Sequence, residues 1–174
     1  MIDYIAKLRA LVGTMPLMLP GTSVLVSDEE GRLLLVRRAD CGTWGLPGGF
    51  MEPGETFAET GVREVREETS LEVSSMALLD VFSGPEYFAV CPNGDEVHNV
   101  TAAYTAVVSR GDLHVDPAEV SAAEFFPLDS LPEDLFAPER PIVERYLADT
   151  ARKEAGSHLT AARTRTDRSA VTSS

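Results

Sequence analysis

The sequence contains very little cysteine. Cys41 and Cys91 are the two cysteines in 174 residues, and neither has a second cysteine or a histidine at metal-ligand spacing. This excludes a disulfide scaffold and a zinc site built on Cys-x-x-Cys pairs. A chain of this length buries roughly 70% of its unfolded surface, so it folds without such staples. We therefore expect reduced thiols, as is typical of the cytoplasm.

Basic residues are also scarce. Fifteen Lys and Arg stand against 28 Asp and Glu, for a net charge of −13. The last 20 residues carry three Arg and one Asp, so residues 1–154 carry −15. Such a body repels nucleic-acid backbones and anionic lipids, which argues against duplex nucleic acid and membranes as partners. A protein this acidic that acts on phosphates would need divalent cations between itself and its substrate.

No long apolar run is present. The most apolar stretch, residues 10–26, is broken by Gly13, Pro16, Pro20 and Gly21 and cannot cross a bilayer as a helix. Residues 1–13 lack the uninterrupted apolar segment of a signal peptide. We expect a soluble, cytoplasmic protein.

The pattern along the chain predicts one central domain with two flanking segments. Residues 1–20 form an amphipathic helix ending near Gly13 and an extended lead-in, residues 21–154 form the domain, and residues 155–174 form a disordered tail. The domain should close with a helix over residues 138–153. Strands are expected over residues 22–27, 32–38, 75–83, 87–91, 96–108 and 124–128, with an Asn-Gly hairpin at residues 92–95.

A helix over residues 57–69 carries the most informative pattern. Thr56 and Glu59 form a capping box at its start. Spacings of four, three and four residues place Ala58, Val62, Val65 and Thr69 on one face, through which we expect Val62 and Val65 to pack on the sheet. Glu64, Glu67 and Glu68 fall on the opposite face. Such a face is usually just solvated, but three carboxylates close to a Gly-Gly loop also suit Mg²⁺ or Mn²⁺, which prefer oxygen ligands.

The segment from Gly48 to Leu71 resembles the Nudix (MutT-like) hydrolases. Their box reads G-x5-E-x7-R-E-U-x-E-E-x-G-U, where U is a bulky aliphatic residue. The matching positions are Gly49, Glu55, Arg63, Glu64, Val65, Glu67, Glu68 and Leu71. Ser70 replaces the second glycine, where a left-handed exit from the helix costs a non-glycine residue on the order of 1 kcal/mol. The resemblance implies an α/β/α sandwich with a mixed β-sheet between helices.

The resemblance also implies roles for individual residues. Glu64, Glu67 and Glu68 would bind Mg²⁺, with Mn²⁺ as a substitute, helped by the backbone carbonyl of Gly48. Arg63 and Glu55 would pair and hold the loop of Gly49 against the helix. The cations would neutralise a pyrophosphate and lower the pKa of a water that attacks phosphorus.

Three further residues have two interpretations each, and two others point to different substrates. Family members differ in their general base, which is a box glutamate such as Glu64 or Glu67 in some and a glutamate of a later loop in others. Glu119 is either a candidate for that loop glutamate or an ordinary loop acid. Arg38 contacts substrate phosphate or is a surface cation, and Trp44 packs in the core or stacks on a base. Tyr87 matches a marker of dinucleoside-polyphosphate hydrolases, whereas Pro85 matches one of ADP-ribose pyrophosphatases, so the two do not decide between substrates.

The sequence thus predicts a Mg²⁺-dependent hydrolase of small nucleotides. Its substrate would be a nucleoside diphosphate linked to another moiety, as in ADP-ribose, nucleotide sugars and dinucleoside polyphosphates, or a nucleoside triphosphate. The alternative is a catalytically silent nucleotide sensor on the same fold. A homodimer is possible through the Ile and Leu face of the N-terminal helix.

Overall fold

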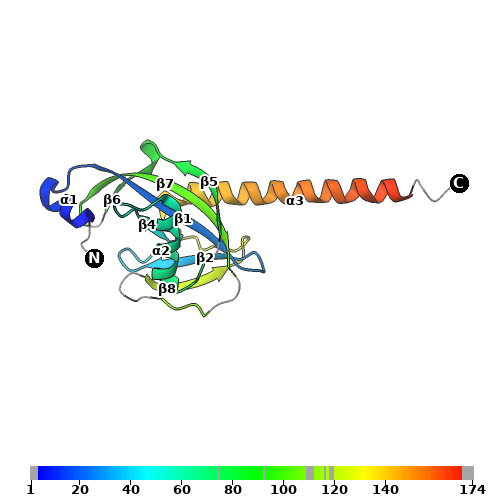
Figure 1. Ribbon diagram of the computed structural model, residues 1–174, viewed down its shortest axis with the longest axis horizontal. Coiled ribbons are helices and arrows are strands. Elements are labelled where there is room, and N and C mark those ends of the chain that lie inside the picture. Colours follow the sequence, from blue (N-terminus) through cyan, green and yellow to red (C-terminus); the bar gives the residue numbers. More distant parts are fainter. Residues whose placement is uncertain are drawn as a thin grey trace.

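A mixed eight-stranded β-sheet forms the centre of the structure (Figure 1). The computed structural model describes residues 4–73, 75–91, 93–108, 112–115, 117 and 120–169, with side chains in the last range as far as 153. The helices are α1 (Tyr4–Val12), α2 (Phe57–Thr69) and α3 (Arg140–Ser169), with 3-10 turns η1 (Pro85–Tyr87) and η2 (Ala137–Glu139). The strands are β1 (Leu17–Ser27), β2 (Leu33–Arg38), β3 (Trp44–Gly45), β4 (Gly48–Phe50), β5 (Met76–Phe82), β6 (Phe88–Val90), β7 (Glu96–Val107) and β8 (Val120–Phe126).

Strand β1 is the axis of the sheet. It pairs in parallel with β7 along its whole length, from Leu17 with Val97 to Ser27 with Val107. On its other side it pairs antiparallel with β4, which holds the glycine loop beside it. We expected this strand to start only at Thr22. It starts five residues earlier because the carbonyl of Pro20 still accepts a hydrogen bond from the Met51 amide, so the proline does not break the pairing.

The core lies on both faces of β1 and β2. Alternate residues of these strands face opposite sides, and both sides are apolar, as in a sheet covered on both faces. One side packs with α2, through Val24, Val26, Leu34 and Val65. The other side packs with the start of α3, through Leu25, Leu33, Leu35, Ile142 and Val143. The predicted sandwich of a mixed sheet between helices is confirmed.

The contact of α2 with the sheet differs from the prediction. Val62 is 37% exposed and Ala58 is exposed, whereas Thr60, Gly61, Val65 and Thr69 are the buried residues. A β-carbon on Gly61 would lie 3.0 Å from the side chains of Thr22 and Val24, so glycine lets the helix approach closely. The Thr69 hydroxyl donates to the Val65 carbonyl of its own helix and the Thr60 hydroxyl donates to the Glu55 carboxylate, which allows threonine to replace aliphatic residues on this face.

The described part of each flanking segment contains helix. Helix α1 ends at Gly13, as expected, and Arg9 holds it to the β6–β7 hairpin by donating to the Glu96 carbonyl at 2.8 Å and pairing with Asp95 at 3.2 Å. Leu11 is 83% exposed, but a dimer through this helix stays a prediction. Helix α3 runs to Ser169, past the predicted end of the closing helix at Lys153, and the disordered tail over residues 155–174 stays a prediction. Residues 154–169 contain no proline and several alanines and arginines, which favour helix.

Ser70 ends α2 in the left-handed conformation, with φ 59° and ψ 11°. It is the single non-glycine residue with positive φ in the described ranges. We expect Ser70→Gly to raise the free energy of unfolding by about 1 kcal/mol, because glycine adopts this conformation without a β-carbon clash. Urea unfolding checks this, with Ser70→Ala, which keeps the β-carbon, as the control. A Ser70→Gly variant no more stable than Ser70→Ala would contradict the argument.

Candidate functional site

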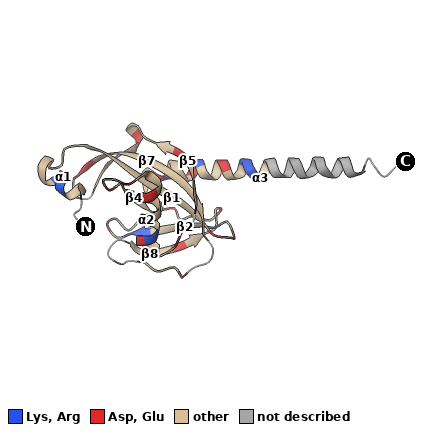
Figure 2. Ribbon diagram, viewed as in Figure 1, with Lys and Arg blue, Asp and Glu red and all other residues tan. Residues whose placement is uncertain are grey.

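A network of charged side chains ties the start of α2 to the preceding loop. All five N–H groups of the Arg63 guanidinium are engaged. Nε and Nη2 donate to the Glu55 carboxylate at 2.6 and 3.0 Å, Nη1 donates to Glu64 at 2.8 Å and Glu67 at 3.0 Å, and Nη2 also donates to the Phe50 carbonyl at 3.1 Å. Arg63 therefore fixes the loop, the helix and two of the three predicted metal ligands relative to one another. Basic and acidic positions lie next to each other along α2 in Figure 2.

The loop end of this network is held equally tightly. Hydrogen bonds from Arg63, the Glu52 amide and the Thr60 hydroxyl lower the pKa of Glu55 to about 2, although partial burial opposes this. Glu55 is therefore ionised throughout the neutral range. The predicted pairing of Arg63 with Glu55 is observed directly as an ion pair of 2.6 Å.

Two glycines lie against the acidic face of α2. A β-carbon on Gly49 would lie 2.4 Å from a carboxylate oxygen of Glu64, and one on Gly48 would lie 2.1 Å from the Thr22 carbonyl oxygen. The Gly48 amide donates to Glu68 at 3.1 Å. Pairing of β4 with β1, Ser23 opposite Gly48 and Thr22 opposite Gly49, sets this approach. Glycine is required here because both sides of the loop are occupied.

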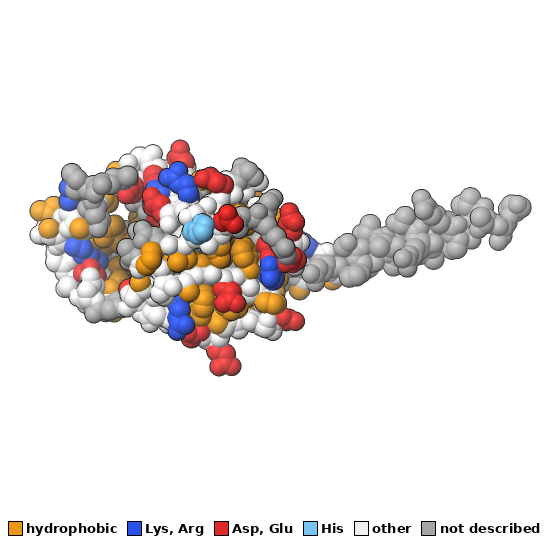
Figure 3. All heavy atoms as spheres, turned by 90° about the horizontal axis from the view of Figure 1, so that it is seen from below, with side chains coloured by type: hydrophobic (Ala, Val, Ile, Leu, Met, Phe, Trp, Pro, Cys, Tyr) orange, Lys and Arg blue, Asp and Glu red, His pale blue; other side chains and the backbone are white. Residues whose placement is uncertain are grey.

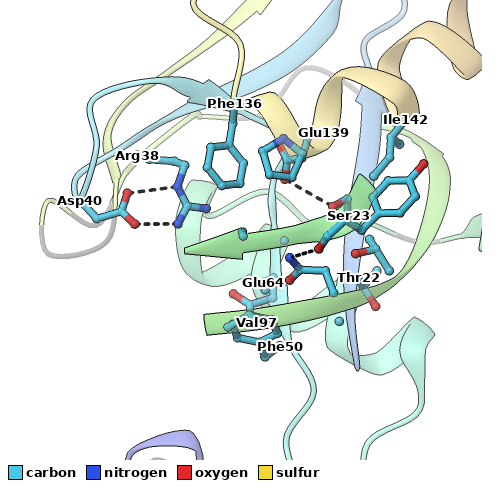
Figure 4. A pocket seen from close by; sticks show the side chains of 18 of the residues that line it. Thr22, Ser23, Arg38, Asp40, Phe50, Glu64, Val97, Phe136, Glu139 and Ile142 are labelled. Atoms are coloured by element: carbon cyan, nitrogen blue, oxygen red, sulfur yellow. Dashed lines mark hydrogen bonds and ion pairs between the residues drawn. The ribbon is translucent and has the colours of Figure 1, made fainter. Parts of the chain in front are cut away.

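These residues form one side of a cavity of about 430 Å³. Its walls come from parts of the chain that are far apart in sequence, several of which are labelled in Figure 4. They include Gly48, Gly49, Glu64 and Glu68 from the box, Thr22 and Ser23 from β1, Arg38 and Asp40 at the end of β2 and just after it, Tyr87 from η1, Asn99 from β7, and Phe136 and Glu139 before α3. Distant segments thus converge on one open cavity, as is common at ligand sites.

The predicted site residues divide into three groups. Gly48, Gly49, Glu64, Glu68, Arg38 and Tyr87 all line the cavity. Glu67, whose side chain is 41% exposed, does not line it and instead pairs with Arg63. Glu119 lies outside the described residues.

Trp44 is also absent from the cavity walls. Its ring packs edge-on against Phe126, with 5.0 Å between centroids, next to the core cluster, and the stacking of Trp44 on a base stays a prediction. Its backbone has a separate role. The Trp44 amide donates to the Asp134 carbonyl, and its carbonyl accepts from the Phe136 amide at 2.7 Å. Trp44 therefore holds in place the segment that leads to Glu139.

Sequence reasoning missed Phe136 and Glu139. Glu139 accepts a hydrogen bond from the Leu46 amide at 2.7 Å, and the hydroxyl of Ser23 lies 3.4 Å from its other oxygen. Burial of the carboxylate raises the pKa of Glu139 to about 7, although the Leu46 amide, Arg38 and Ser23 act in the opposite direction. The only local signal is a Pro-Glu pair directly before an amphipathic helix, which does not predict a contact 93 residues away.

The donor set of the cavity fits a hard divalent cation. As the side chains stand, the described residues contain no group of three carboxylate, imidazole or thiol side chains poised around one point. Mg²⁺ does not require such a cage, because it is commonly bound by one or two carboxylates together with water and substrate phosphates. Glu64 and Glu68 line the cavity and supply those carboxylates.

The surface and helices agree with the charge argument. On the face shown in Figure 3, basic side chains are scattered among acidic ones and form no continuous patch among the residues described there. Within the described ranges, none of the helices combines the length and apolar composition needed to cross a bilayer.

Known proteins share this architecture. The family model of the NUDIX domain matches residues 18–146. An ADP-ribose pyrophosphatase of Methanocaldococcus jannaschii is 34% identical over 125 residues, covering 70% of this chain and 69% of that protein. The crystal structure of a MutT NUDIX hydrolase from Burkholderia pseudomallei superposes with a TM-score of 0.62 at 28% identity, over 74% of this chain and 98% of that one.

A further solved structure supports the fold alone. The NUDIX domain of Shewanella oneidensis NrtR, crystallised with ADP ribose, has a TM-score of 0.63 at 23% identity and covers 77% of this chain and 89% of that one.

Proposed function

Because this chain belongs to the Nudix family and is a Nudix hydrolase of the pyrophosphatase type, we propose that it uses Mg²⁺ to cleave a phosphoanhydride bond of a nucleoside diphosphate linked to another moiety, with ADP-ribose as the first candidate. The observation that carries this proposal is the position of Glu64 and Glu68 on the wall of a cavity large enough for a nucleotide. The name of the 34% identical relative supports ADP-ribose as the starting point.

Glu64 and Glu68 are the proposed metal ligands. Both carboxylates line the cavity, one against Gly49 and the other bonded to the Gly48 amide, and Gly48 is the proposed backbone ligand. Mg²⁺ held there would supply positive charge against the diphosphate and make a nearby water more acidic. Glu67, which pairs with Arg63 outside the cavity wall, would join this set when its bond to Arg63 exchanges.

The remaining box residues act through position. Arg63 orients Glu64 and Glu67, and Glu55 keeps Arg63 in place. We propose Glu64 as the group that accepts the proton of the attacking water, since it lies at the cavity. Glu119, which lies outside the described residues, stays a second candidate for that step. Arg38 and Tyr87, on the cavity wall, are proposed substrate contacts.

The test is a panel of ADP-ribose, nucleotide sugars, dinucleoside polyphosphates and nucleoside triphosphates. Each is incubated with Mg²⁺, with Mn²⁺ and with EDTA, and products are separated by chromatography. We expect nucleoside monophosphate to be released from a diphosphate-linked substrate with either metal, and at least about 10³-fold less with EDTA, because removing the cation removes several kcal/mol of charge stabilisation.

Two outcomes would contradict the proposal. Equal cleavage in EDTA would exclude the metal role of the glutamates. Tight nucleotide binding with no product after many hours would favour the sensor instead.

A further inference from the structure

Arg9 joins three parts of the chain at the N-terminal end of the molecule. Its Nη2 donates to the Glu96 carbonyl at 2.8 Å, and its Nε lies 3.2 Å from the Asp95 carboxylate. Its Nη1 donates to the carbonyls of Gly13 and Met15 at 3.1 and 2.7 Å, where α1 ends. The Arg9 side chain is only 11% exposed, although α1 has no buried residue. One guanidinium therefore holds the end of α1, the lead into β1 and the tip of the β6–β7 hairpin together, beside one another in Figure 1.

The same hairpin forms one wall of the cavity. We call its cavity-lining residues the hairpin wall: Tyr87, Ala89, Cys91, Val97 and Asn99. Ala89 pairs with Val97 across the hairpin, so their side chains point to the same face, and Val97 is labelled on the cavity in Figure 4. The Asn99 side chain donates to the Tyr87 carbonyl at 3.0 Å, which joins the two ends of this wall. The two residues that Arg9 contacts on the hairpin directly precede Val97.

Strand β6 has little other support. It is three residues long and, among the described strands, pairs with β7 alone. On the face that points away from the cavity, Phe88 is 39% and Val90 is 60% exposed, so burial of this face adds little stability. A short strand with one neighbour and few buried contacts opens easily. The contacts that Arg9 makes at the tip of the hairpin therefore have a large effect on where this wall lies.

We propose that Arg9 is a positioning residue that keeps the hairpin wall in place and thereby sets the affinity of the cavity for its substrate. Arg9 is not part of the cavity wall, so it acts through the hairpin. A wall that is in place for only a fraction of the time lowers the apparent affinity by that fraction. The inference rests on the proposed nucleotide substrate. It gives helix α1, which precedes the Nudix domain that begins at residue 18, a role in the site.

Arg9→Ala is expected to loosen the hairpin without disturbing the opposite side of the cavity. In hydrogen exchange followed by NMR, the amides of residues 87–91 and 93–99 should exchange at least about tenfold faster than in the wild type, whereas those of α2 should not change. Lys7→Ala, an exposed change on the same helix, should exchange as the wild type does. This measurement requires no catalytic activity.

Steady-state hydrolysis of the best substrate of the panel tests the consequence for affinity. We expect Arg9→Ala to raise KM about tenfold and to keep kcat within about twofold, because Glu64 and Glu68 lie on α2, which Arg9 does not contact. A merely structural role would lower kcat with the amount of folded protein and leave KM unchanged. Asp95→Asn removes the ion pair from the hairpin side and should raise KM by less, since the Glu96 carbonyl still accepts from Arg9.

The results that contradict the proposal are distinct from those that contradict the hydrolase. Unchanged exchange of the hairpin in Arg9→Ala, faster exchange with an unchanged KM, or the same rise of KM in Lys7→Ala would each overturn the role of Arg9. If the wild type cleaves no member of the panel, the proposed function fails, and the affinity is read from calorimetry with ADP-ribose instead. Weaker binding to Arg9→Ala by about tenfold would then support the role of Arg9, whereas equal binding or none to either protein would overturn it.

Discussion

Glu68→Gln is expected to lower kcat by at least about 10³-fold without unfolding the protein. The substitution removes one of the two α2 carboxylates that line the cavity, and a neutral amide binds a hard cation poorly. The hydrogen bond from the Gly48 amide, 3.1 Å in the wild type, can still form to the amide oxygen. The fold should therefore be kept while the charge that faces the substrate is lost.

The measurement is steady-state hydrolysis of the best substrate of the panel, over a range of Mg²⁺ concentrations, together with a thermal melt. Glu72→Gln is the matched control: it removes the same charge from an exposed position just beyond α2 and should retain wild-type kcat. A Glu68→Gln variant with wild-type kcat and unchanged metal dependence would reject Glu68 as a ligand.

The local features of the site could be read from the sequence because their causes are local. Helix α2 begins and ends at the predicted residues, since the Thr56–Glu59 capping box and the left-handed Ser70 lie within one turn of its ends. Arg63 and Glu55 are eight residues apart, so a loop and a helix start are enough to bring them together. The box end of the cavity was predictable for this reason.

The other end of the cavity depends on contacts that no spacing encodes. Glu139 reaches the site because Trp44 pairs with the segment before it, and this pairing joins residues more than 90 positions apart. The same limit explains why Val62 is exposed although it was predicted to be buried. Hydrophobic periodicity favours valine on the buried face, whereas the close packing of Gly61 on Thr22 turns the helix so that the neighbouring position, Gly61, faces the sheet instead. A hydrophobic pattern cannot reveal a close approach of helix and sheet that depends on glycine having no side chain.

Arg63→Lys is expected to lower both stability and activity, because lysine offers three donors from one nitrogen where Arg63 uses five from a planar fork. Glu55, Glu64, Glu67 and the Phe50 carbonyl cannot all be satisfied by an ammonium group. Breaking a largely buried pair of this kind costs roughly 3 kcal/mol or more. Activity should fall as well, since Glu64 loses the contact that orients it.

The pH dependence identifies the source of this loss. The pKa of Glu55 is lowered to about 2 from an ordinary value near 4.5. A depressed carboxyl pKa contributes stability that is complete above the unfolded pKa and is lost as the pH falls toward 2; the shift corresponds to about 3 kcal/mol. Urea unfolding at pH 7, 5 and 3 should show the wild type losing its advantage over Arg63→Lys between pH 5 and 3.

Arg66→Lys is an exposed change on the same helix, and its free energy of unfolding should differ from that of the wild type by the same amount at every pH. If the difference in free energy of unfolding between Arg63→Lys and the wild type were also the same at every pH, the lost stability would come from packing and not from Glu55. If the wild type and Arg63→Lys instead became equally stable at low pH, the stabilising charge would be that of Glu55, whose ion pair with Arg63 also holds Arg63 against Glu64. The arginine that orients the acidic face of α2 would then be shown to stabilise the fold through Glu55, so that one side chain serves both the stability of the loop and the geometry of the site.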